Sequence, residues 1–123
     1  MLSPMGALLA GGTAGVLARY FVSLSVFGWC GGRLPWGTMA VNLTGCLLVG
    51  FFDAAAAKRG FGGPHGRMLL MTGFCGAYTT FSSLIIEFDA LLRTAPLRGA
   101  AYVFVSVALG LALFRGGAAL GGN

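Results

Sequence analysis

The sequence predicts an all-α membrane protein, and the prediction rests on composition and length. Hydrophobic residues make up 57% of the 123-residue chain and charged residues only 9%, whereas a soluble domain carries about 25% charged residues. A helix needs about 20 apolar residues to cross a bilayer. Residues 1–123 therefore allow a single domain of four transmembrane helices. The 22 glycines favour close packing of such helices, because small residues let them approach one another.

The four predicted spans are apolar runs separated by short polar loops. We place them over residues 5–29, 34–57, 68–92 and 97–120. The separators contain glycine, proline and charge, as loops between antiparallel neighbouring helices do. Pro96 suits the first turn of the fourth span. Arg115 must either end that helix or extend its side chain to the membrane surface.

The basic residues near the span ends give almost no preference for one orientation. One predicted side of the membrane carries four basic residues, Lys58, Arg59, Arg67 and Arg115. The other side carries three, Arg33, Arg93 and Arg98. An excess of Lys and Arg marks the cytoplasmic side. The balance therefore predicts insertion in both orientations and pairing of two copies as an antiparallel dual-topology dimer. The alternative is one orientation, fixed by span hydrophobicity or by helper proteins.

The third span contains the stretch TGFCGAYTTFSSLIIEF, which has glycines and hydroxyls at its middle. Helix preference is low where Gly73 and Gly76 lead into the β-branched pair Thr79 and Thr80. A broken helix at membrane depth is tolerated where protein or a water-filled cavity surrounds it, and freed carbonyls there bind ions. We expect a break at the centre of this helix, with carbonyls near Gly76 and Thr79 facing a cation or a second copy. The alternative is an unbroken helix whose hydroxyls bond its own backbone.

Polar residues also form stripes on the second and fourth spans. Thr38 and Asn42 lie four residues apart in the second, and Tyr102 and Ser106 four apart in the fourth, a spacing that shares one helix face. Together with the third span, the stripes predict helices around a narrow hydrophilic path. Taken singly, each stripe can also be explained by structural hydrogen bonds. Asn42 could bond a neighbouring helix, and Ser106 could bond the backbone of its own helix.

Arg19 lies near the centre of the first span. A charge there is costly unless it faces water or a partner. Two interpretations are open. Arg19 lines an aqueous vestibule and attracts anions, or it forms a structural pair with Glu87 or Asp89.

Nothing in the sequence predicts an enzyme or a nucleic-acid-binding protein. Cys30, Cys46 and Cys75 lack the spacing of a metal site or a disulfide framework. His65 is the single histidine and has no catalytic partner. The basic residues are scattered between the spans, so they form no nucleic-acid patch.

These features resemble the Fluc (CrcB) family of fluoride channels. The resemblance is carried by GGTAGVLARY, by PWGTMAVNLTG, by GFCGAYTTFSS with its following glutamate, and by the stripe of Tyr102 and Ser106. It implies a dual-topology homodimer with two antiparallel pores in the inner (plasma) membrane of the cell. Through these pores fluoride would leave the cytoplasm down its electrochemical gradient, which protects against fluoride toxicity.

The resemblance also implies roles for individual residues. Asn42 would donate hydrogen bonds to the ion, and Phe81 would belong to the aromatic pair that lines each pore. Backbone carbonyls of Gly76 and Thr79, from both subunits, would hold a structural sodium ion at the dimer centre. The whole implied fluoride pathway consists of Arg19, Asn42, Thr80, Phe81, Ser82, Leu84, Tyr102 and Ser106.

One position departs from the family pattern. The family usually reads T-T-F-S-T-F, whereas this chain reads TTFSSL, so Leu84 replaces the second phenylalanine. An aromatic edge carries partial positive charge that can face an anion, and leucine offers shape alone. We expect conduction to persist and Leu84→Phe to be tolerated. In the alternative, a second homologous chain supplies the missing ring.

Two other functions remain as rivals. A small dual-topology proton-coupled multidrug exporter would rely on a membrane-embedded glutamate in the first span, and that span has no acidic residue. A non-transporting membrane assembly subunit would use the small residues for packing alone.

Overall fold

The computed structural model describes residues 3–32 and 34–123, and this part of the chain is all-helical. Four helical spans are long and apolar enough to cross a membrane: Pro4–Cys30, Trp36–Arg59, Gly63–Thr94 and Pro96–Gly122. Three of them are the continuous helices α1 (Pro4–Cys30), α2 (Trp36–Arg59) and α6 (Pro96–Gly122). The third comprises α3 (Gly63–Arg67), the π-helix η1 (Met68–Cys75), α4 (Gly76–Tyr78) and α5 (Phe81–Thr94). The prediction of four apolar helical spans is confirmed.

Local chemistry sets the ends of these helices. The Ser3 hydroxyl accepts the Gly6 N–H at 3.1 Å and caps α1, whose first turn begins with Pro4. Gly60 ends α2 at φ 62°, a left-handed conformation that glycine adopts without strain. Pro96 lies in the first turn of α6, as its sequence position predicts.

One expectation about span boundaries needs correction, and one open alternative is decided. Residues 63–67, predicted as loop, form α3, because Pro64 occupies a first-turn position where its missing N–H has no helical partner. The fourth helix does not end at Arg115; α6 continues to Gly122. Of the two alternatives for Arg115, ending the helix is therefore excluded.

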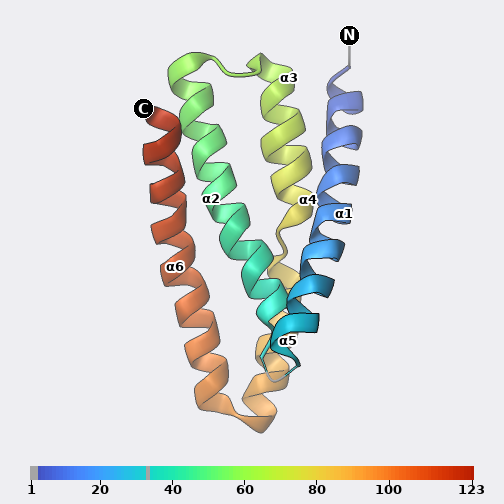
Figure 1. Ribbon diagram of the computed structural model, residues 1–123, viewed down its shortest axis with the longest axis vertical. Coiled ribbons are helices and arrows are strands. Elements are labelled where there is room, and N and C mark those ends of the chain that lie inside the picture. The colour runs from blue at the N-terminus through green and yellow to red at the C-terminus, as the bar shows by residue number, and fades with distance from the viewer. Residues whose placement is uncertain (1–2, 33) are drawn as a thin grey trace.

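The helices pack through glycines that bring backbones together. In Figure 1, α6 lies beside α2, and α1 lies beside the segment from α3 to α4. A Cβ at Gly117 of α6 would overlap the Leu47 carbonyl of α2, and one at Gly50 would overlap the Phe114 carbonyl. Both chain termini lie at the same end of the molecule, opposite the α5–α6 connection (Figure 1).

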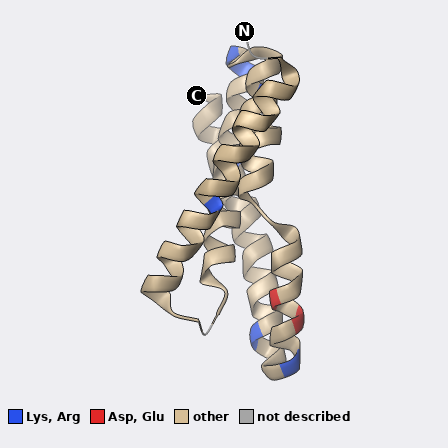
Figure 2. Cartoon of the chain, turned by 90° about the vertical axis from the view of Figure 1, so that its right-hand side faces the viewer, with Lys and Arg blue, Asp and Glu red and all other residues tan. Residues whose placement is uncertain are grey.

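The outer surface is apolar, and few large side chains are buried in the interior. Trp29 is 91% exposed and Leu97 is 84% exposed, while Val41 is the one large side chain among the described residues that is fully buried. Charged residues gather mainly toward the two ends of the molecule (Figure 2). Such a surface suits contact with lipid or with other apolar helices.

Candidate functional site

The third span loses its helical conformation at two residues. α4 ends at Tyr78, Thr79 has φ −84° and ψ 159°, and Thr80 has φ −150° and ψ 116°, after which α5 begins at Phe81. Both threonines are therefore extended. Backbone groups released from a helix inside a membrane need other partners, because lipid offers none.

Asn42 of α2 supplies those partners for Thr80. Its amide oxygen accepts the Thr80 N–H at 2.7 Å, and its amide nitrogen donates to the Thr80 carbonyl at 2.9 Å. One side chain thus binds both backbone groups of one residue. A primary amide has two N–H donors, so one donor of Asn42 is not used by Thr80. Asn42 therefore bonds a neighbouring helical segment, which is one of the two roles considered for it. Its second N–H remains available to donate to an ion.

The threonine hydroxyls stabilise the helix ends on either side of the extended pair. The Thr79 hydroxyl donates to the Cys75 carbonyl at 2.9 Å. The Thr80 hydroxyl accepts the Ser83 N–H at 3.3 Å and lies 3.1 Å from the Ser83 hydroxyl. Thr80 is consequently the N-cap of α5, a position that favours threonine.

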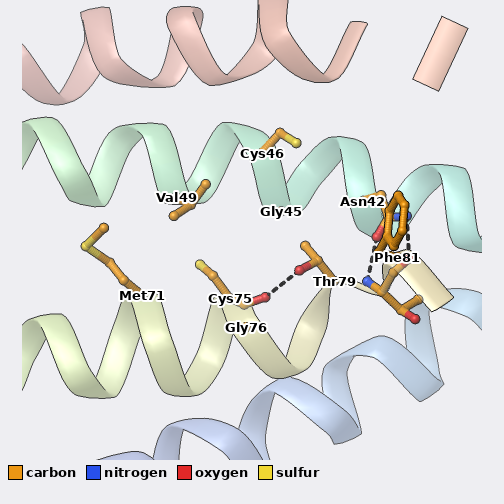
Figure 3. A pocket seen from close by; sticks show the side chains of 10 residues that line it. Asn42, Gly45, Cys46, Val49, Met71, Cys75, Gly76, Thr79 and Phe81 are labelled. Carbon is orange, nitrogen blue, oxygen red and sulfur yellow. Dashed lines mark hydrogen bonds between the residues drawn. The ribbon is translucent and has the colours of Figure 1, made fainter. Parts of the chain in front are cut away.

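An open groove of about 380 Å³ runs beside the extended pair, between α2 and the segment from η1 to Phe81 (Figure 3). Asn42 and Phe81 lie at the same end of this groove (Figure 3), and the Phe81 side chain is largely exposed. The complete lining is Asn42, Gly45, Cys46, Val49, Met71, Cys75, Gly76, Thr79, Thr80 and Phe81. None of these side chains carries a formal charge.

Two carbonyl oxygens in this groove lack backbone hydrogen bonds within the described residues, those of Gly76 and Thr79. Their usual helical donors would be the N–H groups of Thr80 and Ser83. These bond to the Asn42 amide oxygen and the Thr80 hydroxyl instead. Free carbonyls at the C-terminal end of a half-helix suit a small monovalent cation, so these residues fit a sodium ion chemically.

A second polar cluster joins three helices around Glu87 of α5. Thr38 of α2 donates to one carboxylate oxygen at 2.6 Å, and Tyr102 of α6 donates to the other at 2.8 Å. A cavity of about 200 Å³, which Ser23 also lines, opens beside Thr38 and Glu87. Sequence reasoning considered Glu87 only as a partner of Arg19 and missed this role, although Thr38 and Tyr102 both stood on polar stripes.

Residues 6–118 match the family described as CrcB-like protein, Camphor Resistance (CrcB). The chain belongs to the CrcB family. It is a family of ion channels and not of enzymes.

Three CrcB relatives bear the name fluoride-specific ion channel FluC. The protein from Chlorobium phaeobacteroides (strain BS1) is 48% identical over 68% of this chain and 65% of its own length. The one from Chlorobaculum tepidum is 46% identical over 87% of this chain and 86% of its own. The one from Solidesulfovibrio magneticus is 44% identical over 76% and 74%, respectively.

The structure brings some of the residues predicted to form the fluoride pathway to the groove and leaves others elsewhere. Asn42, Thr80 and Phe81 line the groove together with Gly76 and Thr79. Leu84 is only 7% exposed and does not line it. Ser82 is exposed on α5. Ser106 is buried, and its hydroxyl has no hydrogen-bond partner in the described part of the chain.

Arg19 is half-buried on α1. Asp89 pairs with Arg93 at 3.0 Å, and Glu87 is bonded to Thr38 and Tyr102. Across residues 3–32 and 34–123, the structure has no ion pair between Arg19 and either acidic residue. The structural pair considered for Arg19 is therefore not formed within this chain.

Proposed function

We propose that this chain is a fluoride-selective channel of the inner (plasma) membrane. It exports fluoride from the cytoplasm by passive electrodiffusion and so protects the cell against fluoride toxicity. One observation carries the proposal: the groove at the interrupted third span combines a spare amide donor on Asn42 with an exposed aromatic ring on Phe81. The names of the CrcB relatives supply the identity of the ion.

The chemistry of the groove suits a small, strongly hydrated anion. Removing water from fluoride is costly, so a path must replace that water with hydrogen-bond donors. The second N–H of Asn42 and the hydroxyl of Ser82 are neutral donors, and the edge of the Phe81 ring adds partial positive charge. Among the residues that the structure describes, no Lys or Arg side chain lines the groove, so the ion is not trapped there by a charged side chain and can leave, which conduction requires.

We infer that two copies of the chain complete the path as an antiparallel homodimer. The exposed Phe81 ring and the open groove leave one side of the path for a second copy to cover. The balance of Lys and Arg across the predicted loops supports insertion in both directions. Arg19 would face the vestibule. Tyr102, Ser106 and Leu84 are buried within the single chain and would border the path from inside the protomer.

A structural sodium ion belongs to this proposal. Its ligands would be the carbonyls of Gly76 and Thr79 from both copies, because these oxygens lack backbone partners within the described residues. When bound, the ion supplies a positive charge that neutralises converging carbonyl dipoles between the two chains.

The proposal is tested with purified protein in liposomes loaded with fluoride or chloride. A fluoride-selective electrode should record rapid efflux from loaded vesicles, and matched chloride vesicles should release little. Protein-free vesicles are the control. Absence of fluoride efflux would favour an assembly subunit, and proton-dependent efflux of lipophilic cations would favour a drug exporter.

Orientation is tested separately with reporters fused to the C-terminus. A reporter active only in the cytoplasm and another active only outside it should both give signal. Signal from one reporter alone would contradict the antiparallel dimer while leaving fluoride conduction open.

A further inference from the structure

The segment that leads into the extended pair has an unusual winding. η1 is a π-helix of eight residues, Met68–Cys75, and it continues directly into α4 and then Thr79. π-helices are rare, mostly occupy single turns, and are frequent at functional sites. A π-helix is also wider than an α-helix, because each hydrogen bond spans five residues instead of four.

α1 contacts this wide helix through a glycine. A Cβ at Gly11 would overlap the Leu69 carbonyl oxygen and would lie 3.0 Å from the Phe74 amide nitrogen. Leu69 and Phe74 are five residues apart, which is the spacing of a π-helical hydrogen bond. Gly11 is buried at this contact, whereas a Cβ on its neighbour Gly12 would meet nothing within 4 Å. The missing side chain at Gly11 therefore admits the backbone of η1, together with the missing side chain at Gly15, where a Cβ would overlap the Phe74 carbonyl oxygen.

The winding of η1 sets the position of the site, because only one short turn separates them. α4 covers Gly76–Tyr78, and the next two residues include Thr80, whose backbone is held by Asn42 of α2. If η1 wound as an α-helix with the same residues, the following backbone would shift by about one residue, or about 100° around the helix axis. Thr80 would then no longer meet Asn42.

We propose that Gly11 is a positioning residue for the ion path. Its missing side chain lets α1 pack against η1 in the π-wound form, and this winding places the Thr79–Thr80 backbone against Asn42. The proposal rests on the proposed function for its link to fluoride, but the structural coupling between α1 and Thr80 is measurable by itself.

The test compares Gly11→Ala with its matched neighbour Gly12→Ala in the reconstituted full chain. Hydrogen exchange, followed by mass spectrometry, reports the amides of residues 79–81, and a fluoride electrode reports efflux per folded protein. We expect Gly11→Ala to raise exchange locally and to lower efflux by about tenfold or more. Gly12→Ala should match the wild type in both measurements.

Exchange decides the positioning role, and efflux by the wild type decides the proposed function. Wild-type exchange at residues 79–81 in Gly11→Ala, or a uniform rise along the whole chain, would overturn the positioning role.

If Gly11→Ala does not assemble, deletion of Leu70 in the same chain decides. Removing one residue from η1 narrows it toward an α-helix while the helices on both sides keep their places. The amides of residues 79–81 should then be protected from hydrogen exchange again. If they are not protected, the inference is overturned. Lack of fluoride efflux by wild type and Gly12→Ala would reject only the function.

Discussion

Asn42 holds the backbone of Thr80 with both ends of its amide and keeps one N–H free. Asn42→Ala leaves the part-buried N–H and carbonyl of Thr80 without partners, at a cost of up to about 1–3 kcal/mol each. We expect a lower unfolding temperature in detergent and a fluoride efflux reduced by about tenfold or more. Thr13→Ala, at an exposed position of α1, is the control. Unchanged efflux from Asn42→Ala would remove Asn42 from the ion path.

Leu84 lies in the interior of the protomer and is 7% exposed. The sequence alone predicts that Leu84→Phe is tolerated, but a larger ring at a buried position forces neighbours apart. We therefore expect Leu84→Phe to conduct fluoride with a free energy of unfolding lowered by about 1–3 kcal/mol. Thermal unfolding and efflux on the same preparation check this. Loss of efflux in folded protein would show that the lining around Leu84 is assigned wrongly.

The sequence predicts part of this site, and the reasons for the rest are local. Asn42 stands on a visible polar stripe, and the weak helix preference around Thr79 and Thr80 marks where the backbone becomes extended. The direction of Leu84 was not predictable, because two extended residues reset the helical phase at Phe81. The role of Glu87 depends on three helices meeting, and no single stretch of sequence contains that information.

α2 and α6 contact each other along a row of glycines, and two adjacent glycines on α6 differ sharply. A Cβ at Gly117 would overlap the Leu47 carbonyl, whereas one at Gly116 would meet nothing within 4 Å. We expect Gly117→Ala to lower the free energy of unfolding by about 1–3 kcal/mol. Gly116→Ala should leave it unchanged or raise it by up to about 1 kcal/mol, because alanine favours helices. Equal unfolding temperatures for the two variants would contradict the close contact.

Tyr102 links α6 to α5 through its hydrogen bond to Glu87 at 2.8 Å. Tyr102→Phe keeps the ring and removes this bond, which should cost about 1–3 kcal/mol, since the acceptor is a carboxylate. Tyr20→Phe, whose ring is 61% exposed on α1, is the matched control. Thermal unfolding of both variants checks the difference, and identical curves would mean that this bond does not stabilise the pairing of α5 and α6.

The helices themselves follow from apolar length and from capping residues. Proline and glycine at the ends of α1, α2 and α6 act as their chemistry predicts. The sequence did not predict α3, where Pro64 starts a helix inside a glycine-rich segment. It did not predict the π-winding of η1 either, because a change from four-residue to five-residue hydrogen bonds leaves almost the same apolar pattern.

Among the described residues, more large hydrophobic side chains are exposed than buried. Large side chains such as Trp29, Leu97 and Phe81 are among its most exposed, and the described residues enclose few large side chains. Such a surface suits contact with lipid or with other apolar helices. The groove beside Asn42 is likewise open on one side. We propose that a second copy of the chain covers this side.

The most direct test of the central claim is fluoride efflux from liposomes with Phe81→Ile, compared with Phe104→Ile. Phe81 is 76% exposed and lines the groove, while Phe104 is 72% exposed on α6 and lines none of the described cavities. We expect Phe81→Ile to slow efflux by about tenfold or more and Phe104→Ile to conduct like the wild type. Equal efflux from both variants, in protein that is folded and inserted, would contradict it.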